Sequence, residues 1–229
     1  MNSSVHQPPE PTLNDVVIII PALNEAARIE AVLTPCLAAN LGPVVVVDDG
    51  SSDATGEVAA RAGATVIRLP HNQGKAAAML AGAEPYHNYP FFMFIDGDLI
   101  NLQTHHLHAL AEPLRTGSAD MSRGDFKGGR WQTHLSQNIS PILNGQRCIR
   151  SELFLAIPEL GTLGYGVEVA IAAAAKAGRW RVHRVPLQGV AQVMKEEKES
   201  SQGLSGMYGR LKMYRQVLAI LFQRFFPKR

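Results

Sequence analysis

Four short strand-like runs, three of them wholly apolar, constrain the fold of this chain more than any other feature of its sequence. The apolar runs cover residues 16–20, 44–47 and 91–95, and residues 64–69 form a fourth run that also contains Thr65 and Arg68. Apolar runs of this length, rich in β-branched residues, are typical of strands that a parallel sheet buries on both faces. The stretches between them have the composition and apolar spacing of helices, over residues 25–39, 53–62 and 74–84. This alternation predicts an α/β fold with a mostly parallel sheet flanked by helices.

The polar residues that end these runs are expected to meet at one edge of the sheet. The carboxyl ends of parallel strands lie side by side, and ligands of such sheets bind just beyond them. The four polar clusters are Pro21–Glu25, Asp48–Asp53, His71–Lys75 and Asp96–Asp98. The topology therefore predicts a ligand site built from residues that are far apart in the sequence.

The second half of the chain shows a weaker pattern. Helices are predicted over residues 104–115, 150–157 and 167–177, and strands over residues 119–123 and 180–185. Residues 124–147 are rich in Gly, Asn, Gln and Ser, which favours a mobile loop or a segment shaped by a substrate.

Length and composition indicate a single domain. The chain has 229 residues, of which 46% are hydrophobic and 18% are charged, a balance typical of a soluble protein with a substantial core. Residues 1–15 are polar and proline-rich and are predicted to form a disordered tail. We expect the domain to cover residues 16–199 and a basic amphipathic helix to cover residues 200–229.

The net charge of +2 hides an uneven distribution. Residues 200–229 hold six basic residues and no acidic one, so the first 199 residues hold 16 basic and 20 acidic residues. Nucleic-acid binding by the main body is therefore not expected. The C-terminal segment, with apolar residues between its basic ones, suits docking on an anionic membrane. The alternative is packing on the domain or on a partner subunit, as in a homodimer.

The cysteines and the N-terminus bear on the compartment. Cys36 and Cys148 have no partner at metal or redox spacing, which favours a reducing environment. Residues 1–15 lack the basic and apolar pattern of a secretory signal. We expect a cytoplasmic protein, with the C-terminal segment as a means of peripheral attachment to the cytoplasmic membrane face.

The sequence Asp96-Gly97-Asp98 is the sharpest chemical feature. Two carboxylates two residues apart at the end of a buried strand can share one hard cation, and their oxygens suit Mg²⁺ or Mn²⁺. Gly97 leaves room for a ligand to approach closely. The structural alternative is a simple polar turn after a strand.

Two other clusters also carry chemistry. Among the carboxylates after the second strand, Asp53 is predicted to cap a helix, and one of Asp48 and Asp49 is placed to accept hydrogen bonds from a base or a ribose. Lys75 lies at a helix start, where a phosphate is favoured; its alternative is a solvated side chain. The chain lacks G-x-G-x-x-G, P-loop and G-x-S-x-G motifs, which argues against dinucleotide dehydrogenases, P-loop NTPases and α/β-hydrolases.

Taken in order, these motifs resemble the family 2 glycosyltransferases of GT-A fold. The resemblance covers roughly residues 15–195 and rests on Ile18–Glu25, Val46–Asp53, Asn72–Lys75 and Asp96–Asp98. It is nearest in character to dolichyl-phosphate sugar synthases and glucosyl-3-phosphoglycerate synthases. It implies a Rossmann-like domain that binds a nucleoside-diphosphate sugar with Mg²⁺ or Mn²⁺.

The resemblance also implies roles for individual residues. The nucleoside-diphosphate sugar would be bound by Pro21, Ala22, Glu25, Asp49, Lys75 and Asp96. The cation would be bound by Asp96 and Asp98. Residues 144–147 resemble the acceptor-side segment of the family, and residues 164–168 resemble its G-Y-G-x-E stretch. Relatives often carry a histidine that completes the metal site, where this sequence has Gln192.

These roles lead to an expected reaction. The cation would neutralise the diphosphate leaving group as the glycosidic bond breaks, with Asp98 and Glu168 as the catalytic residues. Glu168 would act as the base for a hydroxyl acceptor. A phosphate acceptor, such as a polyprenyl phosphate, needs no base and would be held by Arg123 and Arg147. The alternatives are a non-catalytic module that binds nucleotide sugars or membranes, and a sugar nucleotidyltransferase.

Overall fold

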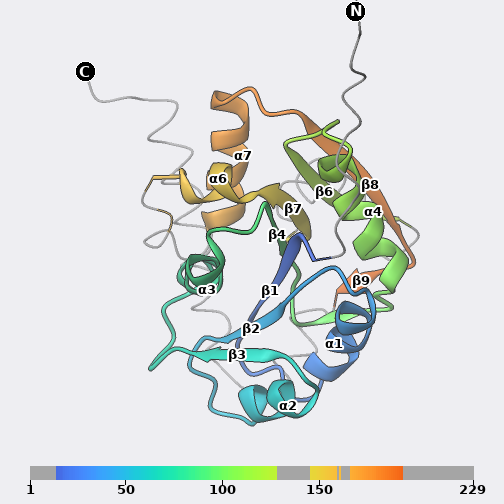
Figure 1. Ribbon diagram of the computed structural model, residues 1–229. Coiled ribbons are helices and arrows are strands. Elements are labelled where there is room, and N and C mark those ends of the chain that lie inside the picture. The colour runs from blue at the N-terminus through green and yellow to red at the C-terminus, as the bar shows by residue number, and fades with distance from the viewer. Residues whose placement is uncertain (1–13, 128–144, 159, 161–165, 193–229) are drawn as a thin grey trace, which may run out of the picture.

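A seven-stranded sheet forms the centre of the protein (Figure 1). The computed structural model describes residues 14–127, 145–158, 160 and 166–192. The strands lie in the order β3 (Thr65–Arg68), β2 (Val44–Asp48), β1 (Val16–Ala22), β4 (Phe91–Phe94), β7 (Arg147–Arg150), β6 (Met121–Lys127) and β8 (Val182–Gln188). This arrangement confirms the predicted α/β, Rossmann-like architecture.

The sheet is mostly parallel. Strand β1 pairs in parallel with β2 and β4, β2 pairs in parallel with β3, and β6 pairs in parallel with β8. Strand β7 runs antiparallel to both of its neighbours, β4 and β6. The carboxyl ends of β1 to β4 therefore meet at one edge, while β7 enters that edge from the opposite direction.

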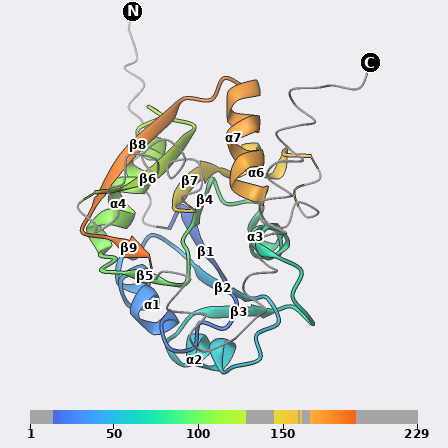
Figure 2. The same cartoon turned by 180° about the vertical axis from the view of Figure 1, so that it is seen from behind.

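Helices cover both faces of the sheet (Figure 2). On one face the core joins α1 (Ile29–Ala38), α2 (Thr55–Arg61) and α4 (Thr104–Arg115). On the other face it joins α3 (Lys75–Ala83), α6 (Ser151–Leu155) and α7 (Val167–Ala177). Successive residues of β1 alternate between the two cores, which explains why this strand is apolar throughout.

Strand β7 is the main departure from the predicted secondary structure. Residues 124–147 are expected to form a mobile or substrate-shaped segment, but β6 continues to Lys127 and β7 begins at Arg147. Arginines occupy both ends of β7, so its sequence shows only two apolar residues in succession. The signal was therefore too short to distinguish from a loop, and the strand forms because β4 and β6 offer backbone partners on both sides.

Two helices begin later than predicted. Helix α1 begins at Ile29 instead of residue 25, and Asn24 adopts a left-handed φ of 56°. Helix α2 begins at Thr55 with Ala54 at its N-cap, so Asp53 is not the cap residue as predicted. In both cases the residues after the strand make hydrogen bonds between turns, which are described below.

A small second sheet joins β5 (Leu99–Ile100) to β9 (Ala191–Gln192) in antiparallel register. It brings Gln192 opposite Leu99 and hence beside the Asp96-Gly97-Asp98 turn. A single 3₁₀ turn, η1 (Glu84–Tyr86), follows α3.

The two ends of the chain extend past the described residues. The carboxylate of Asp15, which was assigned to the expected tail, pairs with Arg115 at the end of α4, so ordered structure begins before β1. The helix predicted over residues 200–229 lies outside the described residues. Within the described part, no helix has the length and hydropathy required to cross a membrane.

Candidate active site

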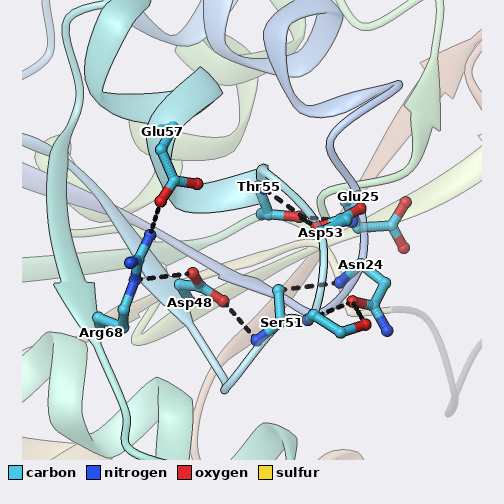
Figure 3. A network of polar contacts seen from close by, with 9 residues as sticks. Asn24, Glu25, Asp48, Ser51, Asp53, Thr55, Glu57 and Arg68 are labelled. Carbon is cyan, nitrogen blue, oxygen red and sulfur yellow. Dashed lines mark hydrogen bonds and ion pairs between the residues drawn. The ribbon is translucent and has the colours of Figure 1, made fainter.

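Hydrogen bonds tie the turn after β1 to the turn after β2 (Figure 3). The backbone N–H of Asn24 donates to Oγ of Ser51 at 3.0 Å. The backbone N–H of Ser52 donates to Oδ1 of Asn24 at 2.9 Å. Asn24 and Ser51 therefore act as connectors, and they bring the first two polar clusters into contact.

A second set of contacts joins the same two turns closer to the helices. The backbone N–H of Glu25 donates to Oγ1 of Thr55 at 2.8 Å, and that of Ala26 donates to Oδ2 of Asp53 at 3.2 Å. Asp53 also accepts from the backbone N–H of Thr55 at 3.0 Å. Glu25, 7% exposed, is held at this junction, and it is one of the residues that the resemblance assigns to the nucleotide sugar.

Asp48 has a structural role. Its Oδ1 accepts from the backbone N–H of Ser51 at 2.9 Å, and its Oδ2 lies 3.3 Å from Nε of Arg68. The side chain is almost fully buried. Of the two neighbouring carboxylates after β2, Asp48 thus stabilises the turn, and Asp49 is the one that faces the third cluster.

Asp49 holds the segment that precedes α3. Its Oδ1 accepts from the backbone N–H of Gln73 at 2.7 Å, and its Oδ2 accepts from that of Gly74 at 2.9 Å. Gly50 has a φ of 73°, and a Cβ there would lie only 2.6 Å from the backbone carbon of His71. The turn and the segment before α3 are therefore packed against each other. Asp49 lies at the predicted edge of the sheet, already bonded on both carboxylate oxygens.

Lys75 forms an ion pair with two carboxylates from different elements. Its Nζ lies 2.6 Å from Oδ1 of Asp96 and 2.7 Å from Oε1 of Glu168. Burial alone would lower the pKa of Lys75, but the two carboxylates outweigh it and raise that pKa. Burial would raise the pKa of Asp96, yet Lys75 and the other donors around it hold this pKa below its usual value. Lys75 and Asp96 are therefore both charged at neutral pH.

The start of β7 covers this ion pair. A Cβ on Gly145 would lie 2.6 Å from both carboxylate oxygens of Asp96 and 2.7 Å from Nζ of Lys75. The next residue, Gln146, donates from Nε2 to Oδ2 of Asp96 at 2.9 Å. Only glycine fits at position 145 without displacing the pair. The predictions for Asp96 omitted both residues, whose only sequence signal was the family resemblance of residues 144–147.

The two arginines assigned to the acceptor differ from each other in how far their side chains are exposed. Arg147 is 2% exposed, and burial lowers its pKa, with the charges of Glu168 and Asp96 opposing that effect. Arg123 forms an ion pair with Asp125, in which Nε lies 3.4 Å from Oδ1. The side chain of Arg123 is 17% exposed and that of Asp125 is 11% exposed. Arg147 is therefore buried within reach of the charges of Glu168 and Asp96, whereas Arg123 is paired with Asp125.

Comparison with known proteins identifies the family of this chain. Residues 17–166 match the family model described as glycosyl transferase family 2. The chain belongs to this family. The assignment confirms the resemblance carried by the four motifs, and it favours a glycosyltransferase over the two alternative functions considered above.

Two curated relatives illustrate how this family 2 chain compares in sequence. It is 31% identical over 180 residues to glycosyltransferase AglJ of Haloferax volcanii, covering 71% of this chain and 58% of the relative. It is 27% identical over 245 residues to glucosyl-3-phosphoglycerate synthase of Mycolicibacterium paratuberculosis, covering 91% of this chain and 72% of the relative. The chain thus spans somewhat more than half of AglJ.

Solved structures of glucosyl-3-phosphoglycerate synthase from Mycobacterium tuberculosis share the fold. One, in complex with Mn²⁺, UDP and glucosyl-3-phosphoglycerate, superposes with a TM-score of 0.70 at 27% identity, over 94% of this chain and 81% of the other. Another, in complex with Mg²⁺ and UDP, superposes with a TM-score of 0.69 at 27% identity over the same shares of the two chains. These neighbours therefore bind UDP together with a divalent cation.

The residues after β4 of this family 2 domain fit such a cation. Nε2 of Gln192 lies 3.0 Å from Oδ1 of Asp98 and 3.3 Å from Oδ2 of Asp96, so the two carboxylates converge on one position. Among the described residues no group of three or more His, Cys, Asp or Glu side chains gathers as a metal site. Two carboxylates suffice for Mg²⁺, which commonly completes its shell with substrate phosphates and water.

Proposed function

We propose that this chain transfers a sugar from a UDP-sugar to a hydroxyl-bearing or phosphate-bearing acceptor, with Mg²⁺ or Mn²⁺ bound by Asp96 and Asp98. The observation that carries the proposal is the convergence of these two carboxylates at the edge where the four predicted clusters meet. The uridine base is taken from the structural neighbours, which were crystallised with UDP.

In this proposal each of the site residues has a separate role. Glu25 and the segment held by Asp49 line the nucleoside side of the site. The bound cation would neutralise the diphosphate as the glycosidic bond breaks. Lys75 keeps Asp96 ionised and oriented through its 2.6 Å contact. Glu168 accepts the proton of a hydroxyl acceptor after it separates from Lys75, whereas a phosphate acceptor requires no base.

A direct assay tests this function. Full-length protein is incubated with UDP-glucose, 3-phosphoglycerate and Mn²⁺, and both UDP release and the glycosylated product are measured. We expect cation-dependent UDP release that EDTA abolishes and that Asp98→Asn reduces at least 100-fold, roughly the contribution of an electrostatic group at a reacting centre. Equal activity with and without a cation would refute the proposed mechanism.

The acceptor needs its own test, because the neighbouring enzymes point to phosphoglycerate while the basic C-terminus suggests a phosphate on a membrane lipid. Each Lys or Arg near an anionic surface contributes about 1 kcal/mol to binding, and residues 200–229 contain six. We expect co-sedimentation with anionic but not neutral vesicles, weakened by salt and lost after truncation at Gly203. Protein that stays in the supernatant at low salt would remove the support for a lipid acceptor.

A further inference from the structure

A cavity of about 390 Å³ lies between the start of α1 and the segment that follows Asp98. Arg28 lines it on the α1 side, and Asp98, Ile100 and Leu102 line it on the other. A volume of this size is within the range of small-molecule sites. Because Asp98 is one of the two proposed cation ligands, the cavity opens directly beside the proposed reaction centre.

The basic side chains already assigned to the site are either paired with carboxylates or buried. Nζ of Lys75 lies between the carboxylates of Asp96 and Glu168. Arg147 is 2% exposed, and Arg123 pairs with Asp125. A phosphate group that enters from solvent needs a cationic donor that faces solvent, and none of these three side chains provides one in this structure.

Arg28 differs from them in both respects. Its side chain is 32% exposed, and its ion pair with Glu25, among the described residues, is a long one, 3.4 Å from NH1 to Oε2. A guanidinium carries five N–H donors in a planar fork that matches phosphate oxygens. Most of this donor capacity is therefore available to a ligand in the cavity.

The opposite wall of the cavity also indicates a ligand. Ile100 is 43% exposed, one of two large apolar side chains in the described residues that are exposed to this degree. Its position in β5 is held from both sides, by pairing with Ala191 of β9 and by a hydrogen bond from Nδ2 of Asn101 to the carbonyl oxygen of Gly189 at 3.4 Å. A ligand with carbon atoms next to its phosphate would cover this side chain.

We propose that Arg28 binds a phosphate group in the cavity beside Asp98. The proposal rests on the proposed function and extends it, since it identifies a side chain for substrate phosphate that neither the motifs nor the resemblance assigned. The phosphate belongs either to the diphosphate of the donor or to the acceptor, and the two sources share the chemistry that Arg28 recognises. Bidentate contact with Arg28 next to a cation on Asp98 would fix that phosphate at the reaction centre.

Calorimetry with separate ligands distinguishes the two sources. UDP, uridine and 3-phosphoglycerate are titrated, each with Mn²⁺, into wild type, Arg28→Gln, Arg28→Lys and the control Arg61→Gln, which changes an exposed arginine on α2. Loss of a charged hydrogen-bonding group predicts about 10- to 100-fold weaker binding of the phosphate ligand. Arg28→Lys should recover part of the loss, and Arg61→Gln should match wild type.

The pattern of losses identifies the source. Weaker binding of UDP but not of uridine assigns Arg28 to the donor diphosphate. Weaker binding of 3-phosphoglycerate with unchanged UDP affinity assigns it to the acceptor. Unchanged binding of both phosphate ligands in Arg28→Gln, with the variant folded as judged by thermal unfolding, overturns the proposal.

Failure of the proposed function would look different. If wild type binds neither UDP nor 3-phosphoglycerate, the proposed function is contradicted, and inorganic phosphate then tests the cavity alone. Phosphate binding, followed by ³¹P line broadening, should be weaker in Arg28→Gln than in wild type. Equal broadening in the two proteins would overturn the role of Arg28 as well.

Discussion

Nζ of Lys75 lies 2.7 Å from Oε1 of Glu168, a residue 93 positions further along the chain. This contact joins the start of α3 to the first turn of α7, and the same Nζ reaches Asp96 at the end of β4. A carboxylate in the first turn of a helix is also favoured by the helix dipole. One ammonium group therefore holds together three elements of the candidate active site.

The first prediction concerns this ion pair. Lys75→Met keeps the apolar stem but leaves Asp96 and Glu168 buried without their shared cation. We expect the free energy of unfolding to fall by roughly 3 kcal/mol, the scale of a broken buried ion pair. Adding Glu168→Gln should restore part of that loss. Urea denaturation of both single variants and the double variant measures the coupling.

Lys176→Met, on the exposed side of α7, is the matched control and should change stability little. Simple additivity of Lys75→Met and Glu168→Gln would show that the contact contributes no coupling and would contradict the prediction.

The second prediction concerns Asp49. Asp49→Ala removes both acceptors for the backbone N–H groups of Gln73 and Gly74. We expect a loss of about 1–3 kcal/mol in stability, since hydrogen bonds to a buried charged group are lost, and weaker UDP binding. Hydrogen exchange at these two amides should accelerate.

Glu152→Ala, an exposed residue of α6, serves as the comparison variant. If Asp49→Ala weakens UDP binding while stability and amide exchange stay at wild-type values, the carboxylate acts on the nucleotide alone and does not hold the segment before α3.

The third prediction concerns the amide shared by the two proposed cation ligands. Gln192→Met removes the donor that lies 3.0 Å from Asp98 and 3.3 Å from Asp96. The carboxylates then repel each other, so the cation-free protein should lose about 1 kcal/mol of stability, the value of a typical hydrogen bond. Mn²⁺ with UDP should raise the melting temperature more in the variant than in wild type, because the cation then takes the place of the missing hydrogen-bond donor and separates the two carboxylates.

Thermal unfolding in EDTA, in Mn²⁺ and in Mn²⁺ with UDP tests this prediction. An identical response of variant and wild type across the three conditions would mean that Gln192 does not influence the acidic pair.

The fourth prediction concerns pH. His106 is 3% exposed, and its Nδ1 accepts from the backbone N–H of Gln103 at 3.1 Å at the start of α4. Burial, and then the nearby charge of His105, lower the pKa of His106 below 6.5. Below pH 6.5 the unfolded chain binds a proton more readily than the folded one, so stability should decrease as the pH falls from 6.5 towards the folded-state pKa.

His106→Gln keeps an acceptor at this helix position but does not titrate, so its stability should depend less on pH over this window. His108→Gln changes an exposed histidine of the same helix and should retain the wild-type profile. Urea denaturation at several pH values below and above 6.5 makes the comparison, and parallel profiles for His106→Gln and wild type would contradict the assignment.

Local sequence patterns predicted the first half of the fold, which contains β1 to β4 and the polar clusters that follow them. The strands β1, β2 and β4 form where apolar runs were found, because a strand buried on both faces must be apolar at every position. The edge strand β3 is partly exposed and carries Thr65 and Arg68. The polar clusters after them meet as expected, because carboxyl ends of parallel strands share one edge. The acidic pair after β4 could also be recognised from its spacing alone.

Only the tertiary structure decided the partners of those residues. Lys75, placed by sequence at a helix start suited to phosphate, instead contacts Glu168, and Arg28 was not singled out at all. An ion pair between residues 93 positions apart leaves no periodic signal, since neither side chain constrains its own neighbours. The same holds for β7, which exists because β4 and β6 supply its hydrogen bonds. The sequence therefore determined which groups are available, and packing determined which of them remain open to a substrate.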